Sequence, residues 1–427
     1  MLTVRRQHLR RLLRVTLLEE VVTDPARGPS LALRPTVIVW MLGLSQIIGY
    51  GTLYYSFSIL ADSAAASFAW PTSWLYGGLS ASLLLGGLVA PEVGKRIDRH
   101  GGALVMTVGS VGAAVTLLMA ALAPNGIVFT IAIIGTGVTG ALVLYEAAFP
   151  TLVQATGTEA RQRITHLTLI AGFASTIFWP LTAWLHGMFD WRQIYIAFAI
   201  ANLVLCLPIH ALLARQHRRG YAAPASASTA PVHAPVPERL RRRALWLVTI
   251  GFALAGFALS AMLAQMVPML TQLGLGTSAL IVSTLFGPAQ VLVRFANMLL
   301  GVRRHPIAAT LIALVMTPVA IITLTLTAPS TAGAVLFAIL LGFGSGLKSI
   351  VQGTLPLALF GSDSYGARLG YMAAARLGLG ALAPFALASI AEAIGAAPAL
   401  WVMAAVGVAG LACMLWIAPI FPHYSRK

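Results

Sequence analysis

Four charged residues interrupt apolar stretches of the sequence, and their chemistry must be explained first. They are Glu146, Arg294, Lys348 and Arg376. A charged side chain in the hydrocarbon core of a membrane costs about 2.5–3.5 kcal/mol on insertion scales, so such residues usually serve a function. Three of the four are cations, and all three lie in the second half of the chain. This set therefore predicts a binding site for a negatively charged solute.

The three cations differ in what they can offer an anion. A guanidinium is a planar fork that holds a carboxylate through two parallel hydrogen bonds, whereas Lys supplies a point charge. Arg294 lies nine residues before Arg303, or about 13 Å along a helix, which places it inside the hydrocarbon. We expect Arg294 to be the main anion ligand, with Arg376 and Lys348 sharing the charge. Pairing with backbone carbonyls, or reaching toward the membrane interface, is the alternative for each.

A polar face on one apolar stretch is the candidate for the opposite wall of the solute path. Gln46, Tyr50 and Tyr54 are spaced four apart, which places them on one face of a helix. Their polar groups could hydrogen-bond a carboxylate. Packing against the apolar stretch near 165–186 is the alternative interpretation.

The composition indicates what positions these residues. The chain is 58% hydrophobic and 9% charged, whereas soluble domains carry about 25% charged residues. Apolar stretches of about 20 residues, the length that spans a bilayer, recur along the chain. We predict an all-α polytopic membrane protein with twelve transmembrane helices, near 37–60, 72–92, 103–122, 127–149, 165–186, 192–213, 244–270, 278–300, 306–328, 332–358, 368–390 and 396–418.

The distribution of Lys and Arg predicts the orientation in the lipid bilayer. Basic residues occur in short bursts between the apolar spans, and Arg192 is the only one between spans on the side opposite the others. Cytoplasmic loops are enriched in Lys and Arg, so we expect a multi-pass inner-membrane protein with both termini cytoplasmic. The net charge of +16 follows from these loops, and nucleic acid is not an expected partner because no single basic face forms.

The order of the spans predicts two six-helix halves. The starts of spans 1–6 recur as those of spans 7–12 after an offset of 203–207 residues. A polar, Ala/Pro/Ser-rich stretch separates the two sets and cannot bury enough apolar surface to fold alone. We expect a basic cytoplasmic segment (1–36), a first half (37–213), a cytoplasmic linker (214–243), a second half (244–418) and a cytoplasmic tail (419–427). Segment 1–36 is interpreted either as a membrane-surface helix or as a disordered basic tail.

A glycine-flanked acidic motif joins spans 2 and 3, with Gly94, Asp98, Arg99 and Gly101 at its key positions. Its glycines permit a tight turn, and Asp98 could accept hydrogen bonds from the N-terminal amides of a helix in the other half. An ordinary basic loop that sets topology is the alternative. The loop 301–305 of the second half lacks the Asp, so we expect one such contact only.

This motif resembles the signature loop of the major facilitator superfamily, Gly-x-x-x-Asp-Arg-x-Gly at the same junction. With the twelve spans and the stretch 187–192 between spans 5 and 6, the resemblance covers residues 37–418. It implies two halves related by an axis along the membrane normal, with a solute site between them near the midplane. It also implies that Gly94, Asp98, Arg99 and Gly101 latch the cytoplasmic side when the protein is open outward.

The Arg in span 8, Arg294, makes the sequence resemble the monocarboxylate and oxalate/formate branch of this superfamily. In that branch an Arg in span 8 holds the substrate carboxylate. Gln290 stands where proton-coupled members have Asp. The absence of this Asp favours exchange or uniport over proton symport, and the coupling ion is expected to be either a proton or a counter-anion. In the superfamily an acidic residue near the cytoplasmic end of span 4 completes a charge relay with the Arg of the signature loop. We expect this for Glu146 with Arg99 or Arg96, and proton coupling is the alternative.

These observations together predict a secondary transporter that moves a small organic anion, specifically a monocarboxylate, by alternating access. Efflux of a drug or other hydrophobic compound is the alternative, followed by a non-transporting membrane sensor. The sequence shows no nucleophile–base pair, metal-binding set or phosphate-binding loop, so we expect no enzyme activity, cofactor or metal. Cys206 and Cys413 both fall within apolar spans, and no disulfide is expected.

Overall fold

The computed structural model describes residues 33–220, 236–276, 278–300 and 306–417. Clustering divides the chain into two units, 1–34 and 35–427. The first falls almost entirely outside the described residues, and the helices named here belong to the second. Within the described ranges every regular element is a helix, so the predicted all-α class is confirmed. The expected N-terminal segment, C-terminal tail and loop 301–305 lie wholly or mostly outside these ranges.

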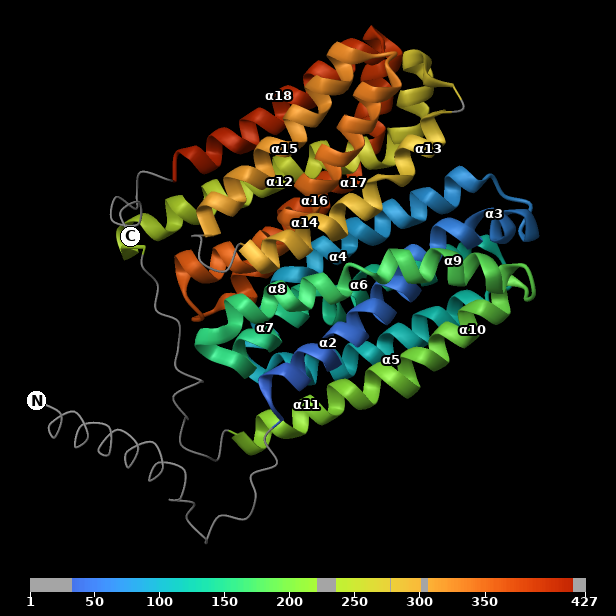
Figure 1. The fold of residues 1–427 in the computed structure, drawn as a ribbon. Coiled ribbons are helices and arrows are strands. Elements are labelled where there is room, and N and C mark those ends of the chain that lie inside the picture. The colour runs from blue at the N-terminus through green and yellow to red at the C-terminus, as the bar shows by residue number, and fades with distance from the viewer. Residues whose placement is uncertain (1–32, 221–235, 277, 301–305, 418–427) are drawn as a thin grey trace, which may run out of the picture. The chain divides into compact units, whose positions relative to one another are not determined.

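The first half of the chain supplies six membrane-crossing segments (Figure 1). They are α2 (Pro35–Tyr50) continued by the π-helix η1 (Gly51–Tyr55) and α3 (Phe57–Ser67); α4 (Thr72–His100); α5 (Gly102–Ala121); α6 (Gly126–Val143) with α7 (Tyr145–Thr156); α8 (Ala160–Ala171) with α9 (Ala174–His186); and α10 (Trp191–Ala201) continued by η3 (Asn202–Cys206) and α11 (Leu207–Gly220).

The second half supplies six more, drawn in yellow to red in Figure 1. They are α12 (Glu238–Leu270) with η5 (Thr271–Leu275); α13 (Ser278–Thr284) with α14 (Phe286–Leu300); α15 (Pro306–Thr327); α16 (Thr331–Phe360); α17 (Tyr365–Ile394); and α18 (Ala396–Leu415). Helices α11 and α12 both extend into the expected linker 214–243.

The span count depends on one long stretch. Eleven helical stretches of the described chain are long and apolar enough to cross a membrane, and one of them, Gly126–His186, has 61 residues. As a straight helix it would be about 90 Å long, roughly three times the hydrocarbon thickness. A 3-10 turn, η2 (Gly157–Glu159), begins at Gly157 with φ +52° and divides it into two crossings. The prediction of twelve transmembrane helices is thereby confirmed.

Helix α4 runs past the end that its hydropathy predicts. It continues to His100 rather than stopping near 92, so Gly94 lies inside the helix and makes no turn. Gly101 ends the helix with φ +88°, a conformation that favours glycine. The expectation of a loop here was wrong. The charged residues after position 92 end the apolar run, but they do not interrupt the backbone hydrogen bonds of the helix.

Two irregularities place side chains toward the centre of the molecule. Leu144 has an extended backbone (φ −85°, ψ −159°) between α6 and α7, so Glu146 lies in the first turn of a new helix. The π-helix η1 contains Tyr54. Single π-turns inside helices occur frequently at functional sites.

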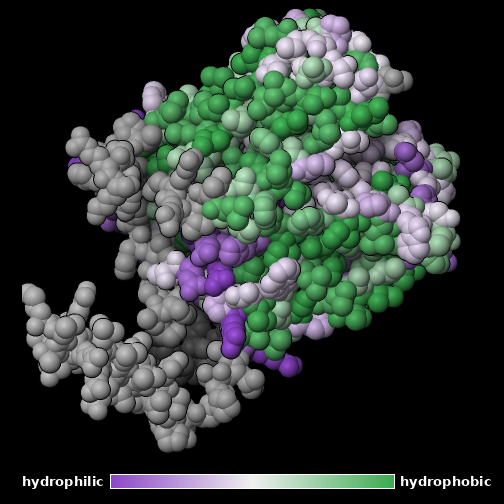
Figure 2. All heavy atoms as spheres, viewed as in Figure 1, coloured by the Kyte–Doolittle hydropathy of each residue, from purple (hydrophilic) through white to green (hydrophobic). Residues whose placement is uncertain are grey.

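The outer surface is apolar. Figure 2 shows hydrophobic residues covering much of the visible face, and large side chains such as Trp40 and Phe385 are 63% and 75% exposed. An apolar exterior of this extent is what contact with lipid tails requires. The structure therefore has the surface of a multi-pass integral membrane protein.

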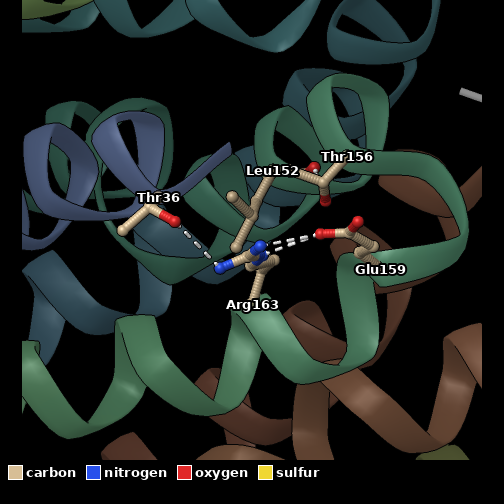
Figure 3. Close-up of polar contacts among 5 residues, drawn as sticks. All are labelled: Thr36, Leu152, Thr156, Glu159 and Arg163. Carbon is tan, nitrogen blue, oxygen red and sulfur yellow. Dashed lines mark hydrogen bonds and ion pairs between the residues drawn. The ribbon is translucent and has the colours of Figure 1, made fainter. Parts of the chain in front are cut away.

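Two arginines donate hydrogen bonds at the ends of helices in the first half. At the start of α8, Arg163 donates to Glu159 (2.8 Å) and to Thr36 at the start of α2 (3.3 Å), as Figure 3 shows. At the other end, Arg192 donates to the carbonyls of Ala121 and Ala123 (3.0 and 2.8 Å) after α5. The exceptional position of Arg192 in the charge distribution is thus explained by its capping of a helix C-terminus.

Candidate functional site

The two halves meet most closely where α4 crosses α17. A Cβ added at Gly94 would lie 2.2 Å from the Gly366 carbonyl oxygen, and one at Gly370 would lie 2.3 Å from that of Ala90. Side chains at these positions would force the helices apart. The glycines therefore allow the two backbones to touch.

Asp98 binds the N-terminus of α17 beside this crossing. Its carboxylate accepts hydrogen bonds from the backbone amides of Gly366 (2.9 Å) and Ala367 (2.8 Å). Amides in the first turn of a helix lack partners within the helix and carry partial positive charge. Arg99 is exposed, and it takes part in none of the ion pairs found among the described residues. The end of the molecule that contains Asp98 is called the Asp98 end below.

A cavity of about 280 Å³ lies between the halves, at the low end of the range for ligand sites. Its lining comes from both halves: Tyr50, Leu53, Tyr54, Leu79, Ser82, Leu83, Gly86, Thr136, Gly137, Gly140, Ala141, Leu144, Glu146, Gly256, Ser260, Lys348, Arg376, Leu377 and Gly380. Of the residues predicted to bind solute, Tyr50, Tyr54, Lys348 and Arg376 line this cavity.

An ion pair joins the halves across the cavity. Arg376 on α17 donates to Glu146 on α7, with Nη2 and Oε1 2.5 Å apart. Both residues also line a second cavity of about 30 Å³, together with Phe149, Phe252 and Leu369. Because Leu369 precedes Arg376 on α17 and is closer to the Asp98 end, the ion pair separates the main cavity from this smaller one.

The position of Glu146 corrects two expectations. It pairs with Arg376 and not with a signature-loop arginine, since Arg96 pairs with Glu92 (3.3 Å). The apolar run suggested an end near residue 149, but α7 continues to Thr156, which leaves Glu146 in the interior. Glu146 therefore offsets one of the three internal cations.

Lys348 is buried, with 8% of its surface exposed. A Cβ added at Gly256 on α12 would lie 3.5 Å from Lys348 Nζ and 3.1 Å from Arg376 Cγ. Both cations therefore approach the same glycine from neighbouring helices. No carboxylate in the described ranges lies within ion-pair distance of Lys348.

Arg294 and Gln46 are not among the residues that line the cavity. Arg294 is 6% exposed and donates through Nε to Ser349 Oγ at 3.1 Å. Its Nη1 atom would be 2.1 Å from a Cβ added at Gly172, so the guanidinium packs against the α8–α9 junction of the other half. Gln46 is fully buried and donates to the Val143 carbonyl at 2.8 Å. The structure thus joins Gln46 to α6 and not to the expected stretch 165–186, and it places Arg294 outside the cavity.

Tyrosines form the wall that faces the cations. Tyr50 packs edge-on against Tyr145 with ring centroids 5.0 Å apart, and Tyr145 stacks on Phe149 at 4.7 Å. Sequence reasoning missed Tyr145, although it adjoins Glu146 and could have been suggested by that position. It also missed Gly256 and Ser260, for which an isolated sequence offers no signal.

The arrangement supplies charges and hydroxyls for binding rather than groups for catalysis. Within the described ranges, no three His, Cys, Asp or Glu side chains come together as a metal site. Both Cys206 and Cys413 are free thiols. What the cavity offers is two cations, one carboxylate and the hydroxyls of Tyr50 and Tyr54.

Comparisons with known proteins identify a matching family and solved structures of the same fold. The model of the family described as "Major Facilitator Superfamily" matches residues 39–384. No curated protein matches the sequence. Among solved structures, the human organic anion transporter MFSD10 (TETRAN) is 16% identical with a TM-score of 0.67, and the alignment covers 91% of this chain and 100% of that one.

Two further solved structures have the same fold. The transporter FucP in its outward conformation is 13% identical with a TM-score of 0.65, with coverage of 90% of this chain and 99% of that one. The proton:xylose symporter XylE, bound to 6-bromo-6-deoxy-D-glucose, is 12% identical with a TM-score of 0.66, with coverage of 91% and 97%. At these identities the likeness concerns the fold alone.

Proposed function

This chain belongs to the Major Facilitator Superfamily, and we propose that the solute it transports is a small organic anion. It is a membrane transporter and not an enzyme. The names of the structural neighbours include an organic anion, fucose and xylose, so the fold does not identify the solute. The proposal therefore rests on the charges in the cavity.

The observation that carries the proposal is that Lys348, which lines the cavity, has no carboxylate partner among the described residues. Two cations and one carboxylate line the cavity, and Glu146 is already paired with Arg376. A buried charge without a partner is strongly unfavourable, so the cavity is most stable when an anion enters. One unpaired positive charge matches one negative charge, which favours a monocarboxylate. In this arrangement Lys348 is the main ligand, and Tyr50 and Tyr54 donate hydrogen bonds from the facing wall.

The proposed orientation follows from the basic residues at the Asp98 end. Lys95, Arg96 and Arg163 lie at that end, and the positive-inside rule places it in the cytoplasm with the protein in the inner membrane. The contact of Asp98 with α17 then closes the cytoplasmic side, and the cavity loads from the opposite side. The two halves, 37–213 and 244–418, alternate around it, while Glu146 exchanges partners as a relay or proton carrier.

The direct test is uptake into proteoliposomes. We expect the purified protein to accumulate labelled acetate or phenylacetate saturably, and the neutral analogue phenylacetamide not to compete. Equal competition by the amide, or uptake of the lipophilic cation tetraphenylphosphonium in place of any carboxylate, would overturn the anion proposal. The second result would indicate efflux of hydrophobic compounds instead.

The contact of Asp98 with α17 gives a testable consequence for transport. Replacing Asp98 by Asn removes the charge and one acceptor atom, and hydrogen bonds to charged groups contribute about 1.5–3 kcal/mol each. We expect carboxylate uptake to fall at least about tenfold, because the cytoplasmic closure is weakened by more than about 1.4 kcal/mol.

The matched control is Glu92→Gln on the same helix. Glu92 pairs only with the exposed residues Lys95 and Arg96, and exposed pairs contribute little. Uptake by this variant should stay within twofold of the wild type. Equal loss in both variants would show that Asp98 acts through general surface charge and not through α17.

A further inference from the structure

Charged and apolar residues are separated within the cavity. Lys348, Arg376 and Glu146 lie at the part nearest the Asp98 end, whereas other lining residues lie further along the same helices. On α17 the lining continues from Arg376 to Gly380, and on α4 it extends back from Gly86 to Leu79, away from the Asp98 end. The cavity therefore has a charged floor beneath a longer upper part.

The upper part is largely apolar. Leu53, Leu79, Leu83 and Ala141 contribute side chains to it, beside the hydroxyls of Tyr54, Ser82, Thr136 and Ser260. Two of those hydroxyls, on Ser82 and Thr136, lie 3.4 Å apart and can satisfy each other. A solute with hydroxyls along its whole length would leave some of them against leucine, at about 1–3 kcal/mol for each unsatisfied group.

Gly256 determines the space at the floor. A Cβ there would come within 3.1 Å of Arg376 Cγ and 3.5 Å of Lys348 Nζ, so a methyl group would occupy the surface in front of the ammonium. The absence of a side chain at this position leaves Lys348 open to the cavity. Gly378 on α17 does not line the cavity, and a Cβ there would meet only Leu84 Cδ1, at 4.0 Å.

We propose that the solute is an anion with one charged headgroup and an apolar body, that it enters headgroup first, and that Gly256 is the specificity-determining residue that admits the headgroup to Lys348. This inference rests on the proposed function and narrows its substrate class. The headgroup replaces water at Lys348, and the body lies between the leucines of α4 and η1.

The test compares four probes of similar size in titrations of the full chain in lipid nanodiscs. They are phenylacetate, the hydroxyl-rich monoanion gluconate, the dianion succinate and neutral phenylacetamide. We expect phenylacetate to bind at least tenfold more tightly than each of the others. Tighter binding of gluconate or succinate would overturn the apolar-body inference while leaving the anion proposal intact. Failure of all three anions to bind would remove both.

Two variants test the role of Gly256. Gly256→Ala should weaken phenylacetate binding at least tenfold, and Gly378→Ala should change it less than twofold. Equal effects would remove the specificity role of Gly256. If Gly256→Ala does not fold, Leu79→Ser provides an independent measurement of the same inference. It leaves the charged floor unchanged and should shift the preference from phenylacetate toward gluconate at least fivefold, and an unchanged preference would overturn the inference.

Discussion

Replacing Lys348 by Met is expected to weaken binding of a small carboxylate by about 30-fold or more. Removing one partner of a buried, hydrogen-bonded charge pair costs about 2–5 kcal/mol, and each 1.4 kcal/mol is a factor of ten in affinity. Met has a similar length and an apolar end, so the cavity stays filled. The variant should fold at least as well as the wild type, because no carboxylate of the described chain loses its partner.

Arg294→Met is the comparison that separates two interpretations of the site. Sequence resemblance makes Arg294 the main ligand, whereas the structure places it against Gly172 and outside the cavity lining. We expect Arg294→Met to change the dissociation constant less than Lys348→Met in the same titration calorimetry experiment. The reverse order would show that the anion binds at Arg294 and that Lys348 has another role.

The second large effect concerns the ion pair between Glu146 and Arg376. Replacing Arg376 by Gln should lower the stability of the protein by about 3–5 kcal/mol, because Glu146 would keep a buried charge without its partner. Only 14% of the Glu146 side chain is exposed, so water can compensate little. The double variant Glu146→Gln with Arg376→Gln should recover much of the loss, because no charge then remains unpaired.

A double-mutant cycle of thermal unfolding in detergent measures this coupling. We expect an interaction energy of at least about 1 kcal/mol, as for residues that share an ion pair. The pair Glu92–Arg96 has the same chemistry but is 55% and 64% exposed, and its coupling should be less than about 1 kcal/mol. Additive losses at Glu146 and Arg376 would show that the two residues contribute independently.

Hydropathy predicted the number of helices and which charges are buried, because both depend on composition along the chain. It did not predict where helices end. Charges after residue 92 stop the apolar run but not the hydrogen bonds of α4, and a run that seemed to end near 149 continues as α7 to Thr156. The mistaken partner of Glu146 follows from that second error.

The partners of buried side chains depend on how each helix is rotated and which neighbour it meets. Arg294 and Lys348 both lie within predicted spans, yet one faces Gly172 across the seam and the other faces the cavity beside Gly256. Gln46 shares a helical face with Tyr50 but meets the Val143 carbonyl. An isolated sequence carries no signal for these choices, since they arise from packing between helices far apart in the chain.

The backbone contact between α4 and α17 has a mechanical consequence. Near Gly94 and Gly366 the two backbones touch directly, and the Asp98 carboxylate joins them through its two hydrogen bonds. The start of α4 at Thr72 lies about 30 Å from this contact at 1.5 Å per residue. A rotation of α4 by about 5° around the contact therefore moves the far end of the helix by about 2–3 Å.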